Sequence, residues 1–157
     1  MIYIFDTNSL SNVLNHYYPE RFPSFWGKFN EMINNKKVIS VRETRFELEV
    51  KFDESTIEQL KKYNAEIFED PTVEELAFIT EIYSIPHFRQ NLDRKKLLQG
   101  GYFADPFIIA KAKVKEAIVV TEEDHPRNGA RIPNICEHFG IECMKLEGFL
   151  IVEDWIF

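Results

Sequence analysis

Short apolar runs alternate along the chain with longer stretches in which apolar residues recur every three or four positions. The short runs predict buried strands, and the longer stretches predict amphipathic helices. Predicted strands cover residues 2–5, 38–41, 65–68, 117–121 and 141–144. Predicted helices cover residues 9–18, 22–34, 42–52, 70–85, 105–115, 132–139 and 146–157. Strands that alternate with helices indicate a three-layer α/β/α domain around a central, mostly parallel sheet.

Two helices have a distinct start signal. Asp105 and Pro106 open the helix before the strand 117–121. Asp is a favoured N-cap, and proline suits the first helical turn. The pair Asp70-Pro71 predicts an earlier helix start in the same way, and Pro86 predicts the end of that helix. On the helix 105–115 the lysines fall mostly on the side that faces away from the sheet, and they are Lys111, Lys113 and Lys115.

Acidic residues follow two of the predicted strands. Asp6 comes directly after the strand 2–5, and residues 122–124 (Glu-Glu-Asp) follow the strand 117–121. Folding gives no reason for a hydrophobic strand to end in three acids. Ligands and catalytic groups of open parallel sheets collect at the carboxyl ends of the strands. We therefore expect Asp6 and the 122–124 acids to lie side by side, with Asp105 brought to them by its helix.

A further acid comes from the helix that follows the strand 38–41. Glu43 and Glu47 are one turn apart and share a face of this helix. Glu43 suits the first turn, where the helix dipole favours a carboxylate. Glu47 lies deeper in the helix, between Phe46 and Leu48. The sequence leaves open which of the two contributes to a site.

Carboxylates that meet at one sheet edge repel one another, at a cost of several kcal/mol unless a cation neutralises them or one is protonated. Divalent magnesium or manganese is the natural partner, because both ions prefer oxygen ligands. Such sites activate water for attack on phosphodiesters. The pattern thus favours metal-dependent phosphodiester chemistry.

Composition and charge narrow the picture. The chain has 157 residues, 45% of them apolar and 14% aromatic, which is typical of one globular domain over residues 1–157. The net charge of -7 argues against a protein that coats nucleic acid generally, yet it leaves room for local RNA contacts. No apolar run approaches the roughly 18 residues of a membrane helix, and no signal peptide is recognisable, so we expect a cytoplasmic protein without a membrane partner. Cys136 and Cys143 are interpreted as reduced packing residues.

Two other stretches have a composition that bears on binding. The helix 22–34 is rich in aromatic residues, and its helical spacing favours a core role over base stacking. The segment 87–99 is basic and polar and runs into Gly100-Gly101. It is the best candidate for contacts to a phosphate backbone. Its basic residues are Arg89, Arg94, Lys95 and Lys96.

Four motifs in order resemble a known family. They are FDTNSL at residues 5–10, ISVRETRFEL at 39–48, ADPFIIAKA at 104–112 and VVTEED at 119–124. Together they resemble the PIN-domain nucleases, the fold shared by VapC-type toxin ribonucleases, over almost the whole chain. The ADPF-IA pattern, the TEE-like ending and the late IP-x-x-C element at 132–136 are similar to those of an uncharacterised bacterial branch of PIN-like proteins.

The resemblance implies a role for particular residues. By position, the metal-binding acids of the family correspond to Asp6, Glu47, Asp105 and Glu123. The polar pair after the first acid and the hydroxyl at the strand end correspond to Thr7, Asn8 and Thr121. Many PIN domains have Asp or Asn at the fourth position, where this chain has Glu123.

The implied function is a Mg²⁺- or Mn²⁺-dependent nuclease, most simply an endoribonuclease that prefers single-stranded RNA. A toxin of this kind is expected to have a small antitoxin as partner, and PIN domains commonly form homodimers. The alternative is a catalytically degenerate PIN-like module that binds RNA or a protein partner without cutting. Metal binding distinguishes the two, because an intact acidic site gains thermal stability from a bound ion.

Overall fold

The computed structural model describes residues 1–61 and 66–157. At its centre lies a sheet of five strands in the order β3-β2-β1-β4-β5, and each neighbouring pair is parallel. The strands are β1 (Tyr3–Phe5), β2 (Val38–Val41), β3 (Phe68–Glu69), β4 (Ile118–Val120) and β5 (Cys143–Met144). The predicted α/β class is confirmed, and the described sheet is parallel throughout. Ala65, part of the predicted strand 65–68, lies outside the described residues.

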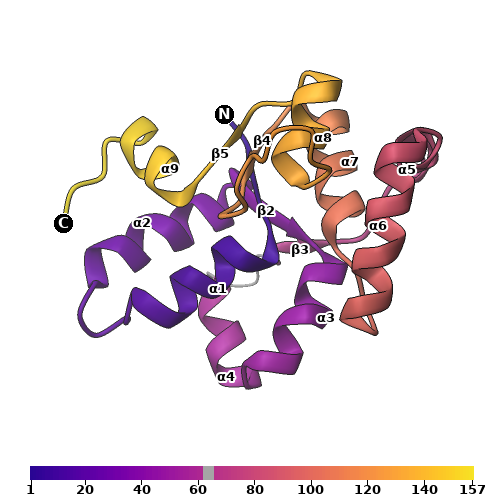
Figure 1. The fold of residues 1–157 in the computed structure, drawn as a ribbon. Helices are drawn as coiled ribbons and strands as arrows, with labels where there is room; N and C mark the ends of the chain where they lie inside the picture. The colour runs from indigo at the N-terminus through magenta and orange to yellow at the C-terminus, as the bar shows by residue number, and fades with distance from the viewer. Residues whose placement is uncertain (62–65) are drawn as a thin grey trace.

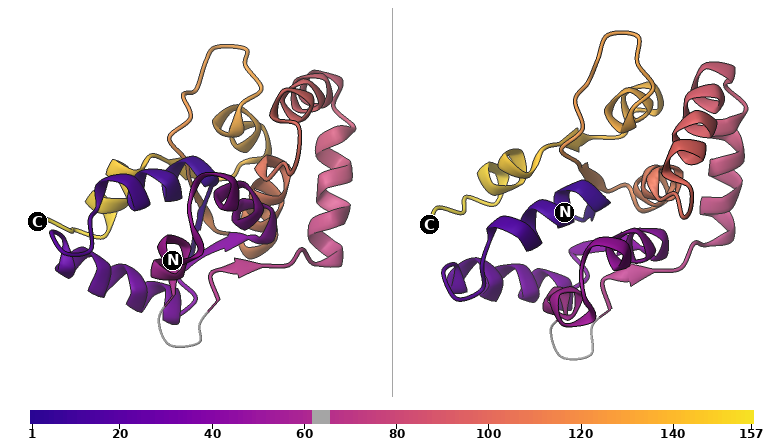
Figure 2. Two further views of the ribbon diagram at one scale, coloured as in Figure 1. Left: turned by 90° about the horizontal axis from the view of Figure 1, so that it is seen from below. Right: turned by 60° about the horizontal axis from the view of Figure 1, so that its bottom comes forward.

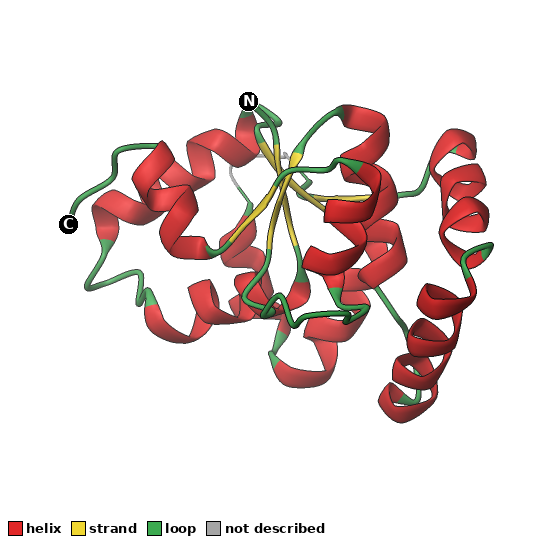
Figure 3. Cartoon of the chain, turned by 45° about the horizontal axis from the view of Figure 1, so that its top comes forward, coloured by secondary structure: helices red, strands yellow, loops and turns green. Residues whose placement is uncertain are grey.

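Helices cover both faces of the sheet, which forms the middle of three layers (Figures 1 and 3). One face carries α1 (Thr7–His16), α2 (Pro23–Asn34), α3 (Arg42–Lys51), α4 (Glu54–Ile57), the 3-10 turn η1 (Glu58–Leu60) and α9 (Leu146–Val152). The other face carries α5 (Val73–Tyr83), α6 (Pro86–Gln99), α7 (Asp105–Lys115) and α8 (Ile132–Phe139). The predicted three-layer arrangement is therefore confirmed.

Each central strand is buried on both faces. Successive side chains of a strand point to opposite faces, so Tyr3 and Phe5 enter the core beneath α2 and α9, while Ile4 enters the core beneath α7 and α8. Phe25 and Trp26 of the aromatic helix α2 are buried in the first of these cores, which supports their interpretation as packing residues. The continuous apolar runs of the sequence follow from this double burial.

Pro86 begins a helix instead of only ending one. It occupies the first turn of α6, where its missing N–H has no intrahelical partner to lose. The basic segment 87–99 is therefore helical, and it ends at Gly100, whose φ of +69° is the left-handed conformation common at helix ends. Figure 2 shows α5 and α6 on the side of the molecule away from the C-terminus.

Both start signals built on Asp-Pro are wrong in detail. Helix α5 is capped by Thr72, whose hydroxyl oxygen accepts the Glu75 N–H, and Asp70 lies outside the helix. Ala104 occupies the N-cap of α7, and Asp105 is its first residue with no capping hydrogen bond. The carboxylate of Asp105 has other partners, described below.

The lysines of α7 are not all on the outside. Lys111 is 1% exposed, and its Nζ lies 2.9 Å from Glu75 Oε1 and 3.3 Å from Glu69 Oε1. Lys115 also pairs with Glu69, at 3.6 Å. Of the three lysines predicted to face outward, Lys111 contradicts the prediction because α5 and β3 cover it with acids, whereas Lys113 is exposed.

The buried pair gives a stability prediction. In Lys111→Met the Glu75 carboxylate is left in the core without its cation, and we expect a loss of about 3–5 kcal/mol in the free energy of unfolding. Urea denaturation measures the loss. Lys113→Met on the same helix is the matched control and should change stability by less than about 0.5 kcal/mol. The double variant Lys111→Met/Glu75→Leu should recover most of the loss, and a double variant as unstable as the single one contradicts this account.

Candidate active site

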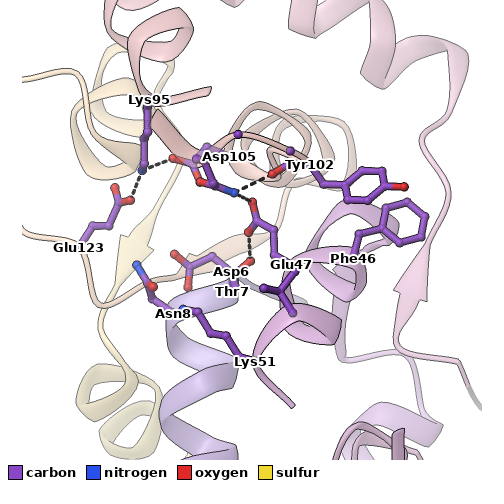
Figure 4. A pocket seen from close by; sticks show the side chains of 14 residues that line it. Asp6, Thr7, Asn8, Phe46, Glu47, Lys51, Lys95, Tyr102, Asp105 and Glu123 are labelled. Atoms are coloured by element: carbon purple, nitrogen blue, oxygen red, sulfur yellow. Dashed lines mark hydrogen bonds and ion pairs between the residues drawn. The ribbon is translucent and has the colours of Figure 1, made fainter. Parts of the chain in front are cut away.

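The four predicted acids line one pocket of about 570 Å³ at the carboxyl edge of the sheet (Figure 4). Asp6 follows β1, Glu47 lies on α3 after β2, Asp105 begins α7, and Glu123 lies three residues beyond β4. Parallel strands bring these segments to the same edge. Residues more than a hundred positions apart in the chain thus face a common space.

Asp6 is held by neutral donors. It caps α1, and its Oδ1 accepts the Ser9 N–H at 2.8 Å. Its Oδ2 accepts a hydrogen bond from the Thr121 hydroxyl. Thr121 is buried behind Asp6 and does not line the pocket, whereas Thr7 and the exposed Asn8 do.

Glu47 enters the pocket, and Glu43 does not. One Glu47 oxygen accepts from the Thr7 hydroxyl, and the other accepts from the Gln99 side-chain amide and, at 3.0 Å, from the Ala104 N–H. Glu43 is buried beside Arg42 and borders a separate pocket. Of the two acids left open by the sequence, Glu47 is the one that joins the other acids.

A lysine connects the remaining two acids. Lys95 of α6 donates to Asp105 Oδ2 and, at 2.5 Å, to Glu123 Oε1 (Figure 4). The second oxygen of Glu123 accepts the Ile132 N–H at 2.9 Å. The site therefore includes a cation of its own.

The expectation that the 122–124 acids have no folding role is wrong. Glu122 Oε1 accepts the N–H of Leu146, the first residue of α9, at a distance of 2.7 Å. Glu123 likewise accepts the N–H of Ile132, the first residue of α8. Asp124 is exposed and pairs with Lys145 at 3.1 Å. Two of these acids thus satisfy backbone donors at helix starts, and Glu123 alone of the three faces the acid pocket.

Sequence reasoning missed two polar contributors. Lys95 was included only as part of a basic segment, and Gln99 was not singled out. They are one turn apart on α6, but their contacts with the acids depend on how α6 packs beside α7, which the local sequence pattern does not show. An aromatic pair was also missed: Phe46 and Tyr102 line the pocket with ring centroids 4.3 Å apart.

Burial dominates the electrostatics of the acids. It raises the pKa of Asp6 to about 6 in spite of the hydrogen bonds that the carboxylate accepts. Burial also raises the pKa of Asp105 to about 7, where Lys95 opposes the shift and the charges of Glu123 and Asp6 add to it. Burial disfavours the charge on Lys95, but Asp105 and Glu123 outweigh it and raise the pKa of this lysine. Four carboxylates and the two ammonium groups of Lys51 and Lys95 leave the pocket with excess negative charge.

The donor set suits a hard divalent cation. All four acids offer oxygen ligands. Burial raises the pKa of Asp6 and of Asp105, so the charged forms of these two carboxylates would be stabilised by a bound cation. As the side chains stand, residues 1–61 and 66–157 contain no group of three or more His, Cys, Asp or Glu close enough to hold an ion. Lys95 lies between Asp105 and Glu123, and Glu47 is turned toward Thr7 and Gln99. The chemistry fits Mg²⁺ or Mn²⁺, and a bound ion requires some of these hydrogen bonds to rearrange.

A family model described as "Domain of unknown function (DUF4411)" matches residues 3–157. The chain belongs to this family. No curated protein sequence matches the DUF4411 chain.

Among solved structures, the DUF4411 chain is similar to a chain of VapBC2 from Rickettsia felis, crystallised with a DNA fragment from their promoter. The match has a TM-score of 0.54 and 17% identity, and it covers 92% of this chain and 98% of that chain. At this identity the likeness shows the fold and not the activity. VapC is a PIN-domain protein, so the predicted PIN-like fold is confirmed. No helix in the described part of the DUF4411 chain is both long and apolar enough to span a bilayer.

The raised pKa of Asp6 gives a prediction for protein kept free of metal with EDTA. The folded state binds this proton more tightly than the unfolded state, so the free energy of unfolding falls as the pH rises from about 4 to about 8. A shift of about two units corresponds to roughly 3 kcal/mol. Asp6→Asn removes the titrating group and should be more stable than the wild type at pH 8, by up to roughly that amount, but not at pH 4.

Urea titrations at the two pH values measure the difference. The control is Asp93→Asn, which changes an exposed residue of α6. Its free energy of unfolding should equal that of the wild type at both pH values. Equal stabilities of wild type and Asp6→Asn at pH 8 contradict the proposed cost of the buried charge.

Proposed function

We propose that this chain is a metal-dependent nuclease that hydrolyses phosphodiester bonds and acts on single-stranded RNA. The observation that carries the proposal is the meeting of Asp6, Glu47, Asp105 and Glu123 in one pocket at the carboxyl edge of a PIN-like sheet. Burial raises the pKa of Asp6 and Asp105 and disfavours their charged forms, which is a cost to stability that a bound cation would offset.

In this mechanism Asp6, Glu47, Asp105 and Glu123 hold Mg²⁺ or Mn²⁺. When bound, such an ion neutralises phosphate charge and lowers the pKa of water. The hydroxyls of Thr121 and Thr7 donate to Asp6 and Glu47, so we assign them to orienting these carboxylates. The amide of Asn8 is exposed at the pocket and is free to donate to a phosphate oxygen.

The aromatic pair supports a single-stranded substrate. Phe46 precedes Glu47 on α3, and the carbonyl oxygen of Tyr102 accepts from Gln99 at 2.6 Å, the same side chain that donates to Glu47. The pair is thereby fixed relative to the acids, and Tyr102 is 59% exposed. Unpaired bases can stack on such rings, whereas the bases of a duplex are already stacked and paired.

Charge also favours stacking as a source of affinity. The net charge of -7 and the acids of the pocket repel a polyanion at long range. Lys51, one turn beyond Glu47, and Lys95 are the basic residues that line the pocket. On α7, Lys111 is buried and Lys115 pairs with Glu69, so this helix is a poor surface for guiding RNA. Stacking, which needs no positive charge, would therefore add to whatever affinity the basic residues of α6 and the pocket supply.

The PIN resemblance and the VapBC2 neighbour also motivate a toxin role in the cytoplasm with a small antitoxin as partner. Apolar side chains near the pocket would suit such a partner, because large exposed apolar residues gather at interaction sites. Val50 lines the pocket, and Leu97 and Leu98 lie exposed near the end of α6. A homodimer is the other assembly that the resemblance implies.

The nuclease proposal predicts metal-dependent cleavage. Pure protein should cut end-labelled single-stranded RNA in Mn²⁺ or Mg²⁺ but not in EDTA. Glu47→Gln and Asp6→Asn should each reduce the cleavage rate by at least about 100-fold, since even outer partners of a metal site are worth roughly 10–100-fold. Glu49→Gln is the matched control: it lies two residues along the same helix, pairs with Arg45 and is exposed, so it should retain activity.

Substrate class is tested in the same assay with single-stranded DNA and duplex RNA of equal sequence. Faster cutting of the duplex contradicts the single-strand preference. Folded protein that is free of any partner and cuts neither RNA nor DNA contradicts the nuclease itself, and it favours a module that binds RNA or protein without cutting.

The aromatic pair makes a separate binding prediction. In an Asp6→Asn background, which leaves the strand uncut, Tyr102→Ala should weaken binding of a labelled single-stranded RNA by about 5- to 150-fold, because one stacked base is worth about 1–3 kcal/mol. Fluorescence anisotropy measures the affinity. Tyr102→Phe keeps the ring and should bind as tightly as the background protein. Equal binding by the alanine and phenylalanine variants would remove the stacking role.

A further inference from the structure

In the described part of the chain, Lys95 is the only cation that contacts any of the four acids, and it contacts two of them. Its Nζ lies 2.5 Å from Glu123 Oε1 and also donates to Asp105 Oδ2. Asp105 and Glu123 come from α7 and from the segment after β4, so the ammonium joins two separate segments. Figure 4 shows Lys95 between these two carboxylates, on the opposite side of the pocket from Lys51.

No cation among the described residues contacts the acids in the other half of the site, Asp6 and Glu47. Asp6 accepts from a backbone N–H and from the Thr121 hydroxyl, and Glu47 accepts from Thr7, Gln99 and a backbone N–H. All of these donors are neutral. Within residues 1–61 and 66–157, the ammonium that contacts the site acids thus lies at Asp105 and Glu123, and Asp6 and Glu47 have no ion-pair partner.

The geometry of α6 holds the lysine in this position. Lys95 and Gln99 are one turn apart, so a single face of α6 contacts Asp105, Glu123 and Glu47. The helix is fixed from behind by Phe88 and Leu92, which are buried in the core under α7 and α8. Helix α6 therefore forms one wall of the site, and Lys95 is paired with acids of the site and not free in solvent.

Many phosphodiester-cleaving sites use two divalent ions about 3.5–4 Å apart, which between them neutralise the attacking and leaving oxygens. An ammonium that contacts two of the four carboxylates takes up the ligands of one of these ions and repels a divalent charge at that distance. The positive charge that the second ion would supply is already present in the chain.

We propose that Lys95 takes the place of a second metal ion, so that the protein binds one divalent ion, on the Asp6 and Glu47 side of the pocket. The inference rests on the proposed nuclease function and specifies how its site divides positive charge between ion and protein. Lys95 faces the pocket and supplies fixed charge to the phosphate.

Metal stoichiometry tests the inference without any nucleic acid. Isothermal titration of Mn²⁺ into the wild type should give one bound ion. Lys95→Met, which keeps the apolar stem and removes the charge, should bind two. Lys96→Met changes the neighbouring, exposed lysine and should bind one, as should Lys95→Arg, which retains the charge.

Two bound ions in the wild type overturn the inference and leave the nuclease proposal in place. A folded Lys95→Met variant that still binds one ion overturns it as well. Wild-type protein that binds no Mn²⁺ overturns both the inference and the metal-dependent function. If Lys95→Met does not fold, Lys95→Gln is measured in its place, and a folded Lys95→Gln variant that binds one ion overturns the inference.

The dependence of cleavage on Mn²⁺ gives a second readout. Wild-type and Lys96→Met rates should rise with the first power of the Mn²⁺ concentration. The Lys95→Met rate should rise with its second power and should approach the wild-type rate at high Mn²⁺, because the second ion then replaces the lost charge. A Lys95→Met rate that stays first order, or that no amount of Mn²⁺ restores, contradicts the replacement.

Discussion

The structure depends on one constraint, which is the repulsion between carboxylates that are buried together at one edge of a parallel sheet. Parallel strands direct their carboxyl ends to the same side, so acids placed after β1 and β4 and on the helices beside them cannot avoid one another. The chain meets the resulting repulsion with hydroxyl groups, backbone N–H groups and the ammonium of Lys95. Several helices are positioned by the same hydrogen bonds, since Asp6 caps α1, Glu47 accepts from the residue before α7, and Glu123 accepts from α8.

Two lysines of this fold each pair with two acids, but they differ in solvent access and therefore in the role that each can have. Lys111 is enclosed by Glu75 and Glu69 under α5, where nothing outside the protein can reach it. Lys95 also pairs with two acids, but its side chain is 39% exposed and lines the pocket. The first pair fixes how α5 packs on α7. The second leaves a charged group available to a ligand.

The sequence was sufficient for the order of the strands and for the meeting of the four acids at one edge of the sheet, because period and position along the chain carry that information. Helix α6 was not predicted, since its residues are mostly polar and Pro86 was interpreted as a helix end. The choice between Glu43 and Glu47 was not accessible, since both lie on one face and only the packing of α3 against α1 and α7 decides which one reaches the pocket. Lys95 was hidden for a similar reason. Its approach to Asp105 depends on α6 ending at Gly100 and on the return of the chain to α7, which no local pattern encodes.

The burial of Lys111 likewise depends on acids more than thirty residues away, so its spacing on α7 alone predicted an outer position. The 122–124 acids were misjudged because helix starts far along the chain use two of their carboxylates. What could not be predicted is therefore mainly the pairing between distant segments.

The length of one side chain has a mechanical consequence. Glu123 reaches Lys95 with one oxygen and the backbone of Ile132 with the other, so it ties the two ends of the protruding loop between β4 and α8 to the wall of the pocket (Figure 2). An aspartate, shorter by one methylene, has less reach for spanning both partners. Many PIN domains have Asp or Asn at this position. Here the longer glutamate links α6 to the start of α8. A ligand that displaced this carboxylate would also remove the acceptor of the Ile132 N–H, so occupancy of the pocket and the order of the first turn of α8 are coupled through one side chain.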